Sequence, residues 1–487
     1  MAKFEYDLGI IGGGAAGLTV ASGAAQLGAK VLLLEKEAAL GGDCLHFGCV
    51  PSKTLIASAN LYHQMKQGPA LGLPAIEPPP VDFAAVAARV REVIGQIQKH
   101  DSEERFCSLG AAVKFGSPHF VDPHAVSLAG KTHSAARWVI ASGSSPANPP
   151  LPGLDQVDFL TNKDLFSLAK LPESLLIIGG GPIAVEMAQA FGRLGSKVTV
   201  IQRSGQILSK EDPDMAALAR EALEEEGVEV ITGSELVRVE RGGGQKAVVY
   251  KTGGGATQKA RGEQILVCLG RAPNLAGLGL AEIGVEFDKK GLKLDARLRT
   301  SLDHVYGAGD VTGSHQFTHA AGYEAGVVLA NAVFRLPRKV DYTWLPWCTY
   351  CQPELASLGL NETAAKKRDI KYQVISQDFR DNDRFLAEGG QRGKLKLLLD
   401  ERENPLGVQI LGPRAGDLLA EWVAVFTGKV KLSTLASAVH PYPTLGEINK
   451  RAAGEVMSPK LFSPLVKNGL KLFFNLKGRA CSLPGDE

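Results

Sequence analysis

The sequence lacks a strong charge of either sign and is poor in cysteine and aromatic residues. Its 487 residues carry a formal net charge of +2, which gives no reason to expect a nucleic-acid partner. Seven cysteines in this length do not form the disulfide framework of a small secreted protein. No apolar run is long enough to span a membrane. These absences leave a globular protein. Its length of 487 residues predicts about three domains.

The N-terminus also lacks the features of a signal peptide. The first residues, MAKFEYD, are charged and run directly into an apolar strand. We therefore expect a reducing, cytoplasmic location. In that compartment a closely spaced pair of cysteines is more often catalytic than structural.

One pattern occurs twice in the chain. Residues 6–17, YDLGIIGGGAAG, form an apolar strand that opens into a glycine turn made by Gly12, Gly14 and Gly17. The segment LLIIGGGPIA repeats this pattern with Gly179 and Gly181. Each copy is followed by a helical stretch and an equivalent strand, LGAKVLLLEK or LGSKVTVIQR. This order is that of a dinucleotide-binding unit, in which the helix N-terminus faces the pyrophosphate.

The two copies differ at the end of the second strand. Glu35 ends this strand in the first copy, where a carboxylate bonds a ribose hydroxyl, and this predicts FAD. Gln202 and Arg203 stand at the equivalent place in the second copy. Replacing the acid and adding a cation favours a 2′-phosphate, hence NADPH, with NADH as the alternative. Arg203 as an ordinary surface charge is the other interpretation.

The segment GGDCLHFGCVPSK places Cys44 and Cys49 just after the first dinucleotide unit. Two thiols this close to a redox cofactor can pass two electrons by opening and closing one disulfide. Pro51 has no N–H to bond the carbonyl of Phe47, so we expect a distorted helix that lets the two sulfurs meet. The alternative is a pair of buried structural cysteines.

Taken together, these motifs resemble the class I pyridine nucleotide–disulfide oxidoreductases, a family of FAD flavoproteins. WVIASGSSP, with Ser142 and Gly143, is similar to the strand that closes the first half of the family's flavin domain. ILVCLGRAPN, with Gly270, is similar to the end of its nicotinamide domain. VYGAGDVTG is similar to its second flavin motif, in which Asp310 would hold the ribityl chain.

The resemblance implies an α/β fold with two Rossmann-like domains and an α+β dimerisation domain. We expect an FAD-binding domain in two parts, residues 1–150 and 286–345, around an NAD(P)-binding domain at 151–285. Residues 346–487 would form the dimerisation domain with a basic C-terminal tail. The implied assembly is a homodimer.

The resemblance also assigns roles to individual residues. Cys49 would lie against the flavin as the charge-transfer thiolate, and Cys44 would attack the substrate. Lys53 and Glu186 match the family's ion pair beside the reactive flavin nitrogen, although each could be a surface charge. Electrons would pass from NAD(P)H to FAD, then to the Cys44–Cys49 disulfide, then to an acceptor.

The segment HPYPTLGE departs from the pattern of the disulfide reductases. In the disulfide reductases the acid–base histidine stands five residues before the glutamate that orients it. The corresponding glutamate in this sequence is Glu447. Tyr442 occupies that position and His440 lies two residues earlier. Mercuric reductases also carry tyrosine there, and a phenol with a pKa of about 10 is a poor base at neutral pH. His440 as the substitute base and His440 as a packing residue both remain open.

Other cysteines and the tail are less specific. Cys348 and Cys351 fall in an expected strand, where residues three apart face opposite sides, so we expect packing rather than a disulfide or metal pair. Mercuric reductases often carry a vicinal cysteine pair near the C-terminus, but this chain has only Cys481 there. Asp43 and His46 replace the threonine and asparagine more usual in glutathione- and lipoamide-type enzymes. The basic, apolar segment 463–479 either makes weak contact with a membrane surface or packs against the dimer.

The first hypothesis is therefore a mercuric-reductase-like enzyme that reduces a thiophilic metal or a thiol adduct. A dihydrolipoamide-dehydrogenase-like enzyme acting on a small thiol or disulfide is the alternative. A redox-responsive flavoprotein partner with little turnover is the alternative from another class.

Overall fold

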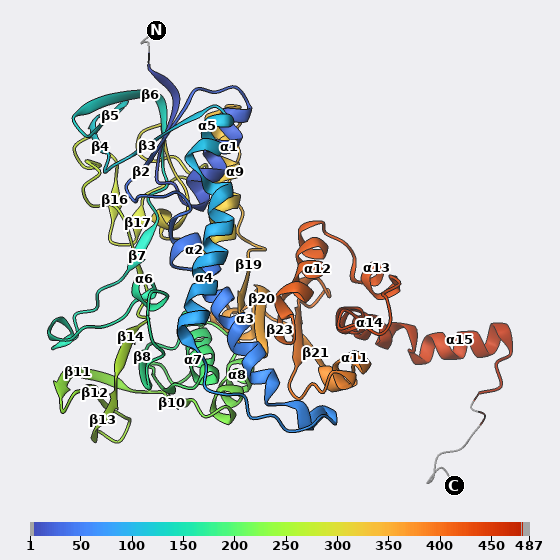
Figure 1. Ribbon diagram of the computed structural model, residues 1–487. Coiled ribbons are helices and arrows are strands. Elements are labelled where there is room, and N and C mark those ends of the chain that lie inside the picture. Colours follow the sequence, from blue (N-terminus) through green and yellow to red (C-terminus); the bar gives the residue numbers. More distant parts are fainter. Residues whose placement is uncertain (1–3, 479, 481–487) are drawn as a thin grey trace. The chain divides into compact units, whose positions relative to one another are not determined.

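The computed structural model describes residues 4–478 and 480. The chain forms two compact units, shown in Figure 1. The first unit contains Met1–Ser209 and Leu223–Tyr342, and the second contains Lys210–Ala222 and Thr343–Glu487. Most of α8 (Pro213–Glu225) therefore belongs to the second unit, although it follows the second dinucleotide motif in sequence.

The first unit is built on a sheet of order β3-β2-β1-β6-β5-β4, with β18 added beside β6. β1, β2, β3, β6 and β18 pair in parallel, whereas β4 and β5 form an antiparallel extension. The strands are β1 (Tyr6–Ile11), β2 (Val31–Glu35), β3 (Ala111–Phe115), β4 (His119–Asp122), β5 (Ala125–Leu128), β6 (Lys131–Ile140) and β18 (Val305–Gly307). Pairing of β18 with β6 returns a segment far along the chain to the N-terminal sheet.

The two faces of this sheet bury different residues because side chains alternate along each strand. Ile10, Leu33 and Val139 pack with α1 (Ala15–Gln26) and α9 (Thr318–Ala332), which lie side by side (Figure 1). Small residues dominate the buried side of α1, so this helix can approach closely. On the other face Trp138 and Ile140 pack in a separate cluster.

A second parallel sheet, of order β10-β9-β8-β14, repeats the arrangement. Its strands are β8 (Ser174–Ile178), β9 (Lys197–Ile201), β10 (Glu229–Ile231) and β14 (Gln264–Val267). Helix α7 (Pro182–Leu194) links β8 to β9. The duplicated motif therefore builds two βαβ units, and the predicted α/β fold is confirmed.

Smaller elements complete the first unit. The antiparallel strands are β11 (Glu235–Gly242), β12 (Gln245–Lys251), β13 (Thr257–Gly262), β7 (Ser144–Pro146) paired with β15 (Arg271–Pro273), and β16 (Phe287–Asp288) paired with β17 (Gly291–Leu292). The remaining helices are α2 (Gly42–His46), α3 (Cys49–Met65), α4 (Phe83–Gln98), α5 (Glu103–Ser108) and α6 (Asn162–Leu165). Short 3-10 turns occupy Gly68–Leu71, Lys99–Asp101, Leu154–Gln156 and Asp310–Thr312.

The second unit is an α+β layer built on an antiparallel sheet of order β19-β20-β23-β22-β21. The strands are β19 (Pro346–Thr349), β20 (Glu354–Gly359), β21 (Gln373–Asp378), β22 (Lys394–Leu399) and β23 (Pro405–Gly412). The helices are α10 (Glu362–Lys367), α11 (Asp383–Ala387), α12 (Ala415–Thr427), α13 (Leu432–Ser437), α14 (Glu447–Leu461) and α15 (Pro464–Phe474), with a 3-10 turn at Phe379–Asp381. Leu397, Ile410, Trp422 and Ile448 are fully buried between the sheet and its helices.

Candidate active site

The cysteine segment follows β2, as the sequence predicts, but it does not form one distorted helix. Cys44 lies in α2, which ends at His46, and Cys49 is the first residue of α3. Phe47 and Gly48 separate the two helices. The distortion expected from Pro51 is therefore a complete break, because one helix ends at His46 and the next begins at Cys49.

Pro51 explains this break. As the third residue of α3, it occupies a position where a helix N–H has no intrahelical partner, so its missing N–H costs nothing. The carbonyl of Phe47 is then left for another donor. The side-chain amide of Asn162 supplies it at 3.0 Å and also donates to Asp43 at 3.1 Å. A residue distant in sequence thus fixes the loop that joins the cysteines.

The pKa values of the two thiols are shifted in opposite directions. The Cys44 thiol donates a hydrogen bond to the Cys49 sulfur, and this bond is the main reason that the pKa of Cys49 falls to about 6. The same bond, together with burial, raises the pKa of Cys44 well above its ordinary range. The hydroxyl of Thr318, at the start of α9, lies 3.3 Å from the Cys49 sulfur and also stabilises the thiolate. Both cysteines are free thiols in the structure.

Lys53 and Glu186 form an ion pair one helical turn beyond Cys49. The Lys53 ammonium lies 2.7 Å from the Glu186 carboxylate, which is 5% exposed, whereas Lys53 is 37% exposed. Glu186 comes from α7 of the second βαβ unit. The positive charge of Lys53 also lowers the pKa of the Cys49 thiol.

The first glycine turn has the geometry of a dinucleotide cradle. Gly12 has φ of +108°, and a Cβ on Gly17 would lie 1.8 Å from the Gly12 carbonyl oxygen, so the turn requires glycine at both places. Gly14 precedes α1 and faces the backbone of Gly42, whose own Cβ would lie 2.7 Å from the Gly14 Cα. The cysteine segment therefore begins beside the helix N-terminus that would hold a pyrophosphate, and the residues present fit FAD.

The second glycine turn is built in the same way. Gly179 has φ of +117°, and its Cβ would lie 2.5 Å from the carbonyl oxygen of Cys268. Gly181 precedes α7, and a Cβ there would meet open space. Gln202 follows β9, with its side-chain amide 3.5 Å from the Gln206 carbonyl oxygen, and Arg203 is exposed. An exposed cation beside an open turn fits a phosphorylated ribose.

Glu35 ends β2 and is already bonded to the backbone. One carboxylate oxygen accepts from the N–H of Gly13 at 2.6 Å, and the other accepts from the N–H of Glu37 at 2.8 Å. Glu35 is 6% exposed. Its carboxylate holds the glycine turn in place, and an oxygen lone pair of a carboxylate can still accept from a ribose hydroxyl.

A polar network lies around Asp310. The Ser144 hydroxyl donates to its carboxylate at 2.5 Å, and the Arg271 guanidinium lies 3.6 Å from it. Arg271 also lies 3.2 Å from Asp43 of the cysteine segment. Burial nevertheless raises the pKa of Asp310.

Three further residues predicted for the cofactor site lie in loops beside this network. The Ser142 hydroxyl donates to the Asn274 carbonyl at 2.7 Å. The Gly143 carbonyl accepts from the Asn274 N–H at 2.9 Å, and the Gly270 carbonyl accepts from Ala147 at 3.0 Å. Asn274, like Arg271, was not among the residues that sequence reasoning selected.

The structure does not join His440, Tyr442 and Glu447 as one acid–base group. The Tyr442 hydroxyl donates to Asp383 at 2.8 Å, and this bond raises the pKa of the phenol. The His440 ring lies 2.9 Å from Glu421 and is 11% exposed. Glu447 is the first residue of α14. Asp383 is therefore the hydrogen-bond partner of Tyr442 and Glu421 contacts His440, while the charge of Glu447 contributes to the raised pKa of the Tyr442 phenol.

The strand argument applies to only one of Cys348 and Cys351. β19 ends at Thr349, so Cys351 lies in the turn beyond the strand. The sulfurs of Cys348 and Cys351 lie 3.6 and 3.9 Å from the same carbonyl oxygen, that of Thr349. The opposite-face prediction was therefore wrong for this pair. Cys481 lies outside the described residues.

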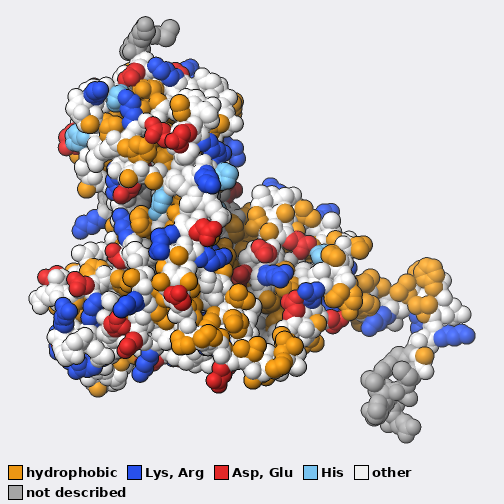
Figure 2. All heavy atoms as spheres, viewed as in Figure 1, with side chains coloured by type: hydrophobic (Ala, Val, Ile, Leu, Met, Phe, Trp, Pro, Cys, Tyr) orange, Lys and Arg blue, Asp and Glu red, His pale blue; other side chains and the backbone are white. Residues whose placement is uncertain are grey.

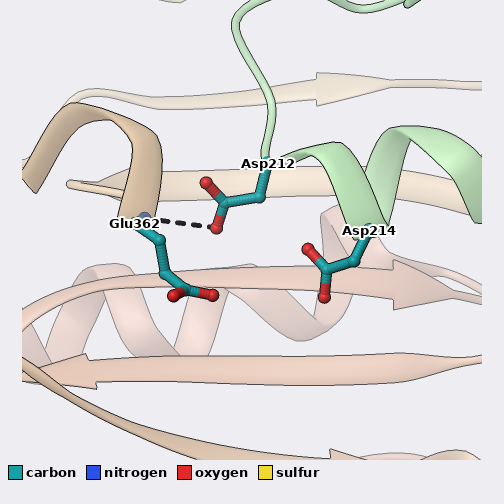
Figure 3. Close-up of side chains that lie close together, drawn as sticks. All are labelled: Asp212, Asp214 and Glu362. Carbon is teal, nitrogen blue, oxygen red and sulfur yellow. Dashed lines mark hydrogen bonds between the residues drawn. The ribbon is translucent and has the colours of Figure 1, made fainter. Parts of the chain in front are cut away.

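The second unit also contains a cluster of carboxylates at Asp212, Asp214 and Glu362, shown in Figure 3. Their oxygens lie within 4.8 Å of one another. The Lys396 ammonium, 2% exposed, lies 2.9 Å from both aspartates and 2.5 Å from Glu362. A buried ammonium thus fills the place where a metal ion would bind, and this cluster is an ion-pair network.

Comparison with known proteins places the chain in a class. Residues 6–325 match the family described as pyridine nucleotide-disulphide oxidoreductase, and residues 345–453 match the dimerisation domain of that family. The chain therefore belongs to the pyridine nucleotide-disulphide oxidoreductases. It is an FAD-dependent enzyme that uses NAD(P)H, and its dimerisation domain indicates a homodimer.

Individual relatives carry two different names. A mercuric reductase of Lysinibacillus sphaericus is 36% identical over 92% of this chain and 82% of its own length. A dihydrolipoyl dehydrogenase of Bacillus subtilis (strain 168) is 35% identical over 90% of this chain and 96% of its own length. Among solved structures, the HOCl-induced flavoprotein disulfide reductase RclA from Escherichia coli matches with a TM-score of 0.83 and 26% identity, covering 93% of this chain and 100% of that one.

None of the helices in the described part of the chain is both long enough and apolar enough to cross a membrane.

Proposed function

We propose that this enzyme uses NADPH to reduce a thiophilic metal ion or a thiol adduct at Cys44 and Cys49, as a mercuric reductase does. The observation that carries the choice of substrate is the hydrogen bond from Tyr442 to Asp383. Tyr442 stands at the position of the family's acid–base histidine, and this hydrogen bond raises the pKa of its phenol further. Such a group can donate a hydrogen bond but cannot accept a thiol proton at neutral pH. Reduction of a metal held by two thiolates does not need that proton shuttle.

The residues of the cysteine segment suit this chemistry. FAD, when bound, supplies the hydride chemistry that links NADPH to the thiols. Cys49 is a thiolate at neutral pH, and Thr318 and Lys53 help to hold its charge. A soft metal ion binds sulfur strongly, and binding displaces the remaining thiol proton, that of Cys44. The two sulfurs would then hold the substrate between them.

The names of several relatives support the proposal. Several are named mercuric reductase, at 34 to 36% identity. RclA has also been solved as a Cu(II) complex, with 25% identity to this chain. Relatives named dihydrolipoyl dehydrogenase reach 35% identity and support a second candidate.

A dihydrolipoamide-dehydrogenase-like activity is the second candidate, and one contact favours it. His440 is held 2.9 Å from the Glu421 carboxylate. A carboxylate that orients an imidazole is the arrangement used for proton transfer. If His440 is the base, thiol and disulfide substrates become accessible.

A screen of acceptors after anaerobic reduction tests these proposals. The holoenzyme is reduced with NADPH or NADH, and turnover is then measured with Hg(II) in excess thiol, lipoamide, glutathione disulfide and coenzyme A disulfide. We expect Hg(II)-dependent oxidation of NADPH that is lost in Cys44→Ser. Turnover of lipoamide without turnover of Hg(II) would overturn the proposal. Negligible turnover of every acceptor would instead favour a redox-responsive partner protein.

Variants separate the two acid–base assignments. Tyr442→His should gain lipoamide turnover, whereas the matched Tyr442→Phe should not. His440→Gln should leave Hg(II) reduction unchanged if His440 only packs against Glu421. Arg203→Glu should raise the KM for NADPH but not for NADH, because it replaces the cation that would meet the 2′-phosphate.

A further inference from the structure

The C-terminal helix α15 lies beyond the part of the chain that matches the family. The match to the dimerisation domain ends at residue 453, within α14, and α15 spans Pro464–Phe474. Capping residues define both ends of the helix. The Ser463 hydroxyl accepts from the N–H of Val466 at 3.3 Å, Pro464 is the first helical residue, and Asn475 ends the helix with φ of +52°.

One face of α15 is apolar and exposed. Successive helical residues are about 100° apart. The apolar residues therefore fall on one broad face, and Lys467, Asn468 and Lys471 fall on the opposite one. The apolar face consists of Leu465, Val466, Leu470, Leu472, Phe473 and Phe474.

This apolar face is not covered within its unit. Leu465 is 83% exposed, Leu472 79%, Phe473 80% and Phe474 72%. No residue of α15 is buried. Figure 2 shows hydrophobic side chains along this helix with basic side chains beside them. Large apolar side chains that cluster in this way mark a contact surface.

The charged residues of this segment have a single sign. Residues 456–478 contain Lys460, Lys467, Lys471 and Lys477 but no aspartate or glutamate, and of these lysines Lys460 is paired with Glu403. A second copy of this chain would bring the same cations to the same place, so charge repulsion opposes pairing of α15 with itself. An anionic surface is complementary to the segment.

We propose that α15 binds peripherally to an anionic lipid surface. The apolar face enters the boundary between headgroups and acyl chains, and the lysines remain at the level of the phosphates. A helix of this length binds weakly and reversibly when alone. A homodimer presents two copies, and the second then binds at a high effective concentration. This inference does not depend on the identity of the electron acceptor.

Flotation of the full-length holoenzyme with vesicles tests the proposal. Vesicles are made of phosphatidylcholine alone or of equimolar phosphatidylcholine and phosphatidylglycerol. We expect flotation with the anionic vesicles, suppressed at high salt because the lysine contribution is screened. Lys467→Gln with Lys471→Gln should weaken binding by about 30-fold, which is roughly fivefold per lysine.

Apolar variants complete the test. Leu472→Glu with Phe473→Glu should abolish flotation, whereas Leu73→Glu, at a loop residue that is 61% exposed, should float as the parent does. NADPH-dependent flavin reduction should be the same in all three proteins. Absence of flotation in the parent, or flotation of the Leu472→Glu, Phe473→Glu double variant, would overturn the proposal. So would a smaller sedimentation coefficient for the double variant, because this would show that a second copy covers the helix.

Discussion

Replacing Cys44 should change the acidity of Cys49 more than any other single substitution. The pKa of Cys49 falls from 9.0 to about 6, and the hydrogen bond from Cys44 is the largest cause. A hydrogen bond to a charged group contributes about 1.5–3 kcal/mol, which corresponds to roughly one to two pKa units. Cys44→Ala should therefore raise the pKa of Cys49 to between about 7 and 8. Thr318 and Lys53 remain in place and keep it below the ordinary value.

The assay is alkylation of the anaerobically reduced enzyme by iodoacetamide across a pH series. Mass spectrometry of the peptide containing Cys49 separates it from the other cysteines. Thiolate is the reactive form, so the midpoint of the rate against pH reports the pKa. At pH 6 the thiolate fraction should fall by about 5- to 50-fold in Cys44→Ala. The midpoint is the better measure, because a thiolate of higher pKa is also intrinsically more nucleophilic.

Two control variants locate the cause. Cys44→Ser retains a hydroxyl donor, so its midpoint should lie between those of the parent and Cys44→Ala. Thr318→Val removes a smaller contribution and should shift the midpoint upward by less than Cys44→Ala does. A midpoint that stays at about 6 in Cys44→Ala would refute the assignment of the hydrogen bond as the main cause.

Three further predictions concern flavin loading and stability. Gly17→Ala should prevent formation of the flavin-loaded protein, because its Cβ would meet a backbone oxygen at 1.8 Å, whereas Gly95→Ala, at an exposed helical site with open space, should load FAD normally; the flavin absorbance of the purified proteins checks both. Lys396→Met should lower the free energy of unfolding by about 3–5 kcal/mol at pH 7, because it leaves the buried Asp212 carboxylate without its cation, and urea titrations should show a smaller loss only below about pH 3.8, because Lys396 helps to hold the pKa values of Asp212 and Asp214 below that value. Burial raises the pKa of Glu324 from 4.5 to about 7, so its contribution to stability is greatest below pH 4.5 and is lost as the pH rises through 7. Glu324→Gln should remove about 3 kcal/mol of this pH dependence, and an unchanged stability profile between pH 5 and 8 would contradict the assignment.

The fold was predictable because its signals are local and repeated. A glycine turn between two apolar strands fixes a βαβ unit wherever it occurs, and the chain contains that pattern at Gly12 and again at Gly179. The cysteine pair was also visible, since both thiols lie within a few residues of each other. The ion pair of Lys53 with Glu186 was found only through the family resemblance, because these residues come from different βαβ units.

The environment of the cysteines could not be predicted from local sequence. Thr318 and Asn162 reach the cysteine segment from α9 and α6, and no spacing rule connects them to it. Pro51 predicts that the carbonyl of Phe47 lacks its helical donor, but it does not identify the residue that donates instead. Such contacts depend on how separate elements pack, and an amide or hydroxyl at a helix start has many local uses.

The chain offers two sets of groups that could attract metal ions, and their surroundings separate them. The carboxylates of Asp212, Asp214 and Glu362 would suit a hard cation, but the buried ammonium of Lys396 already neutralises part of their charge and occupies the space between them. The sulfurs of Cys44 and Cys49 favour soft ions and lie where an FAD-linked electron supply would reach them. Any metal that this enzyme reduces should therefore be thiophilic. Calcium and magnesium should neither bind at the carboxylate cluster nor compete with Hg(II), and competition by either ion would show that this division is wrong.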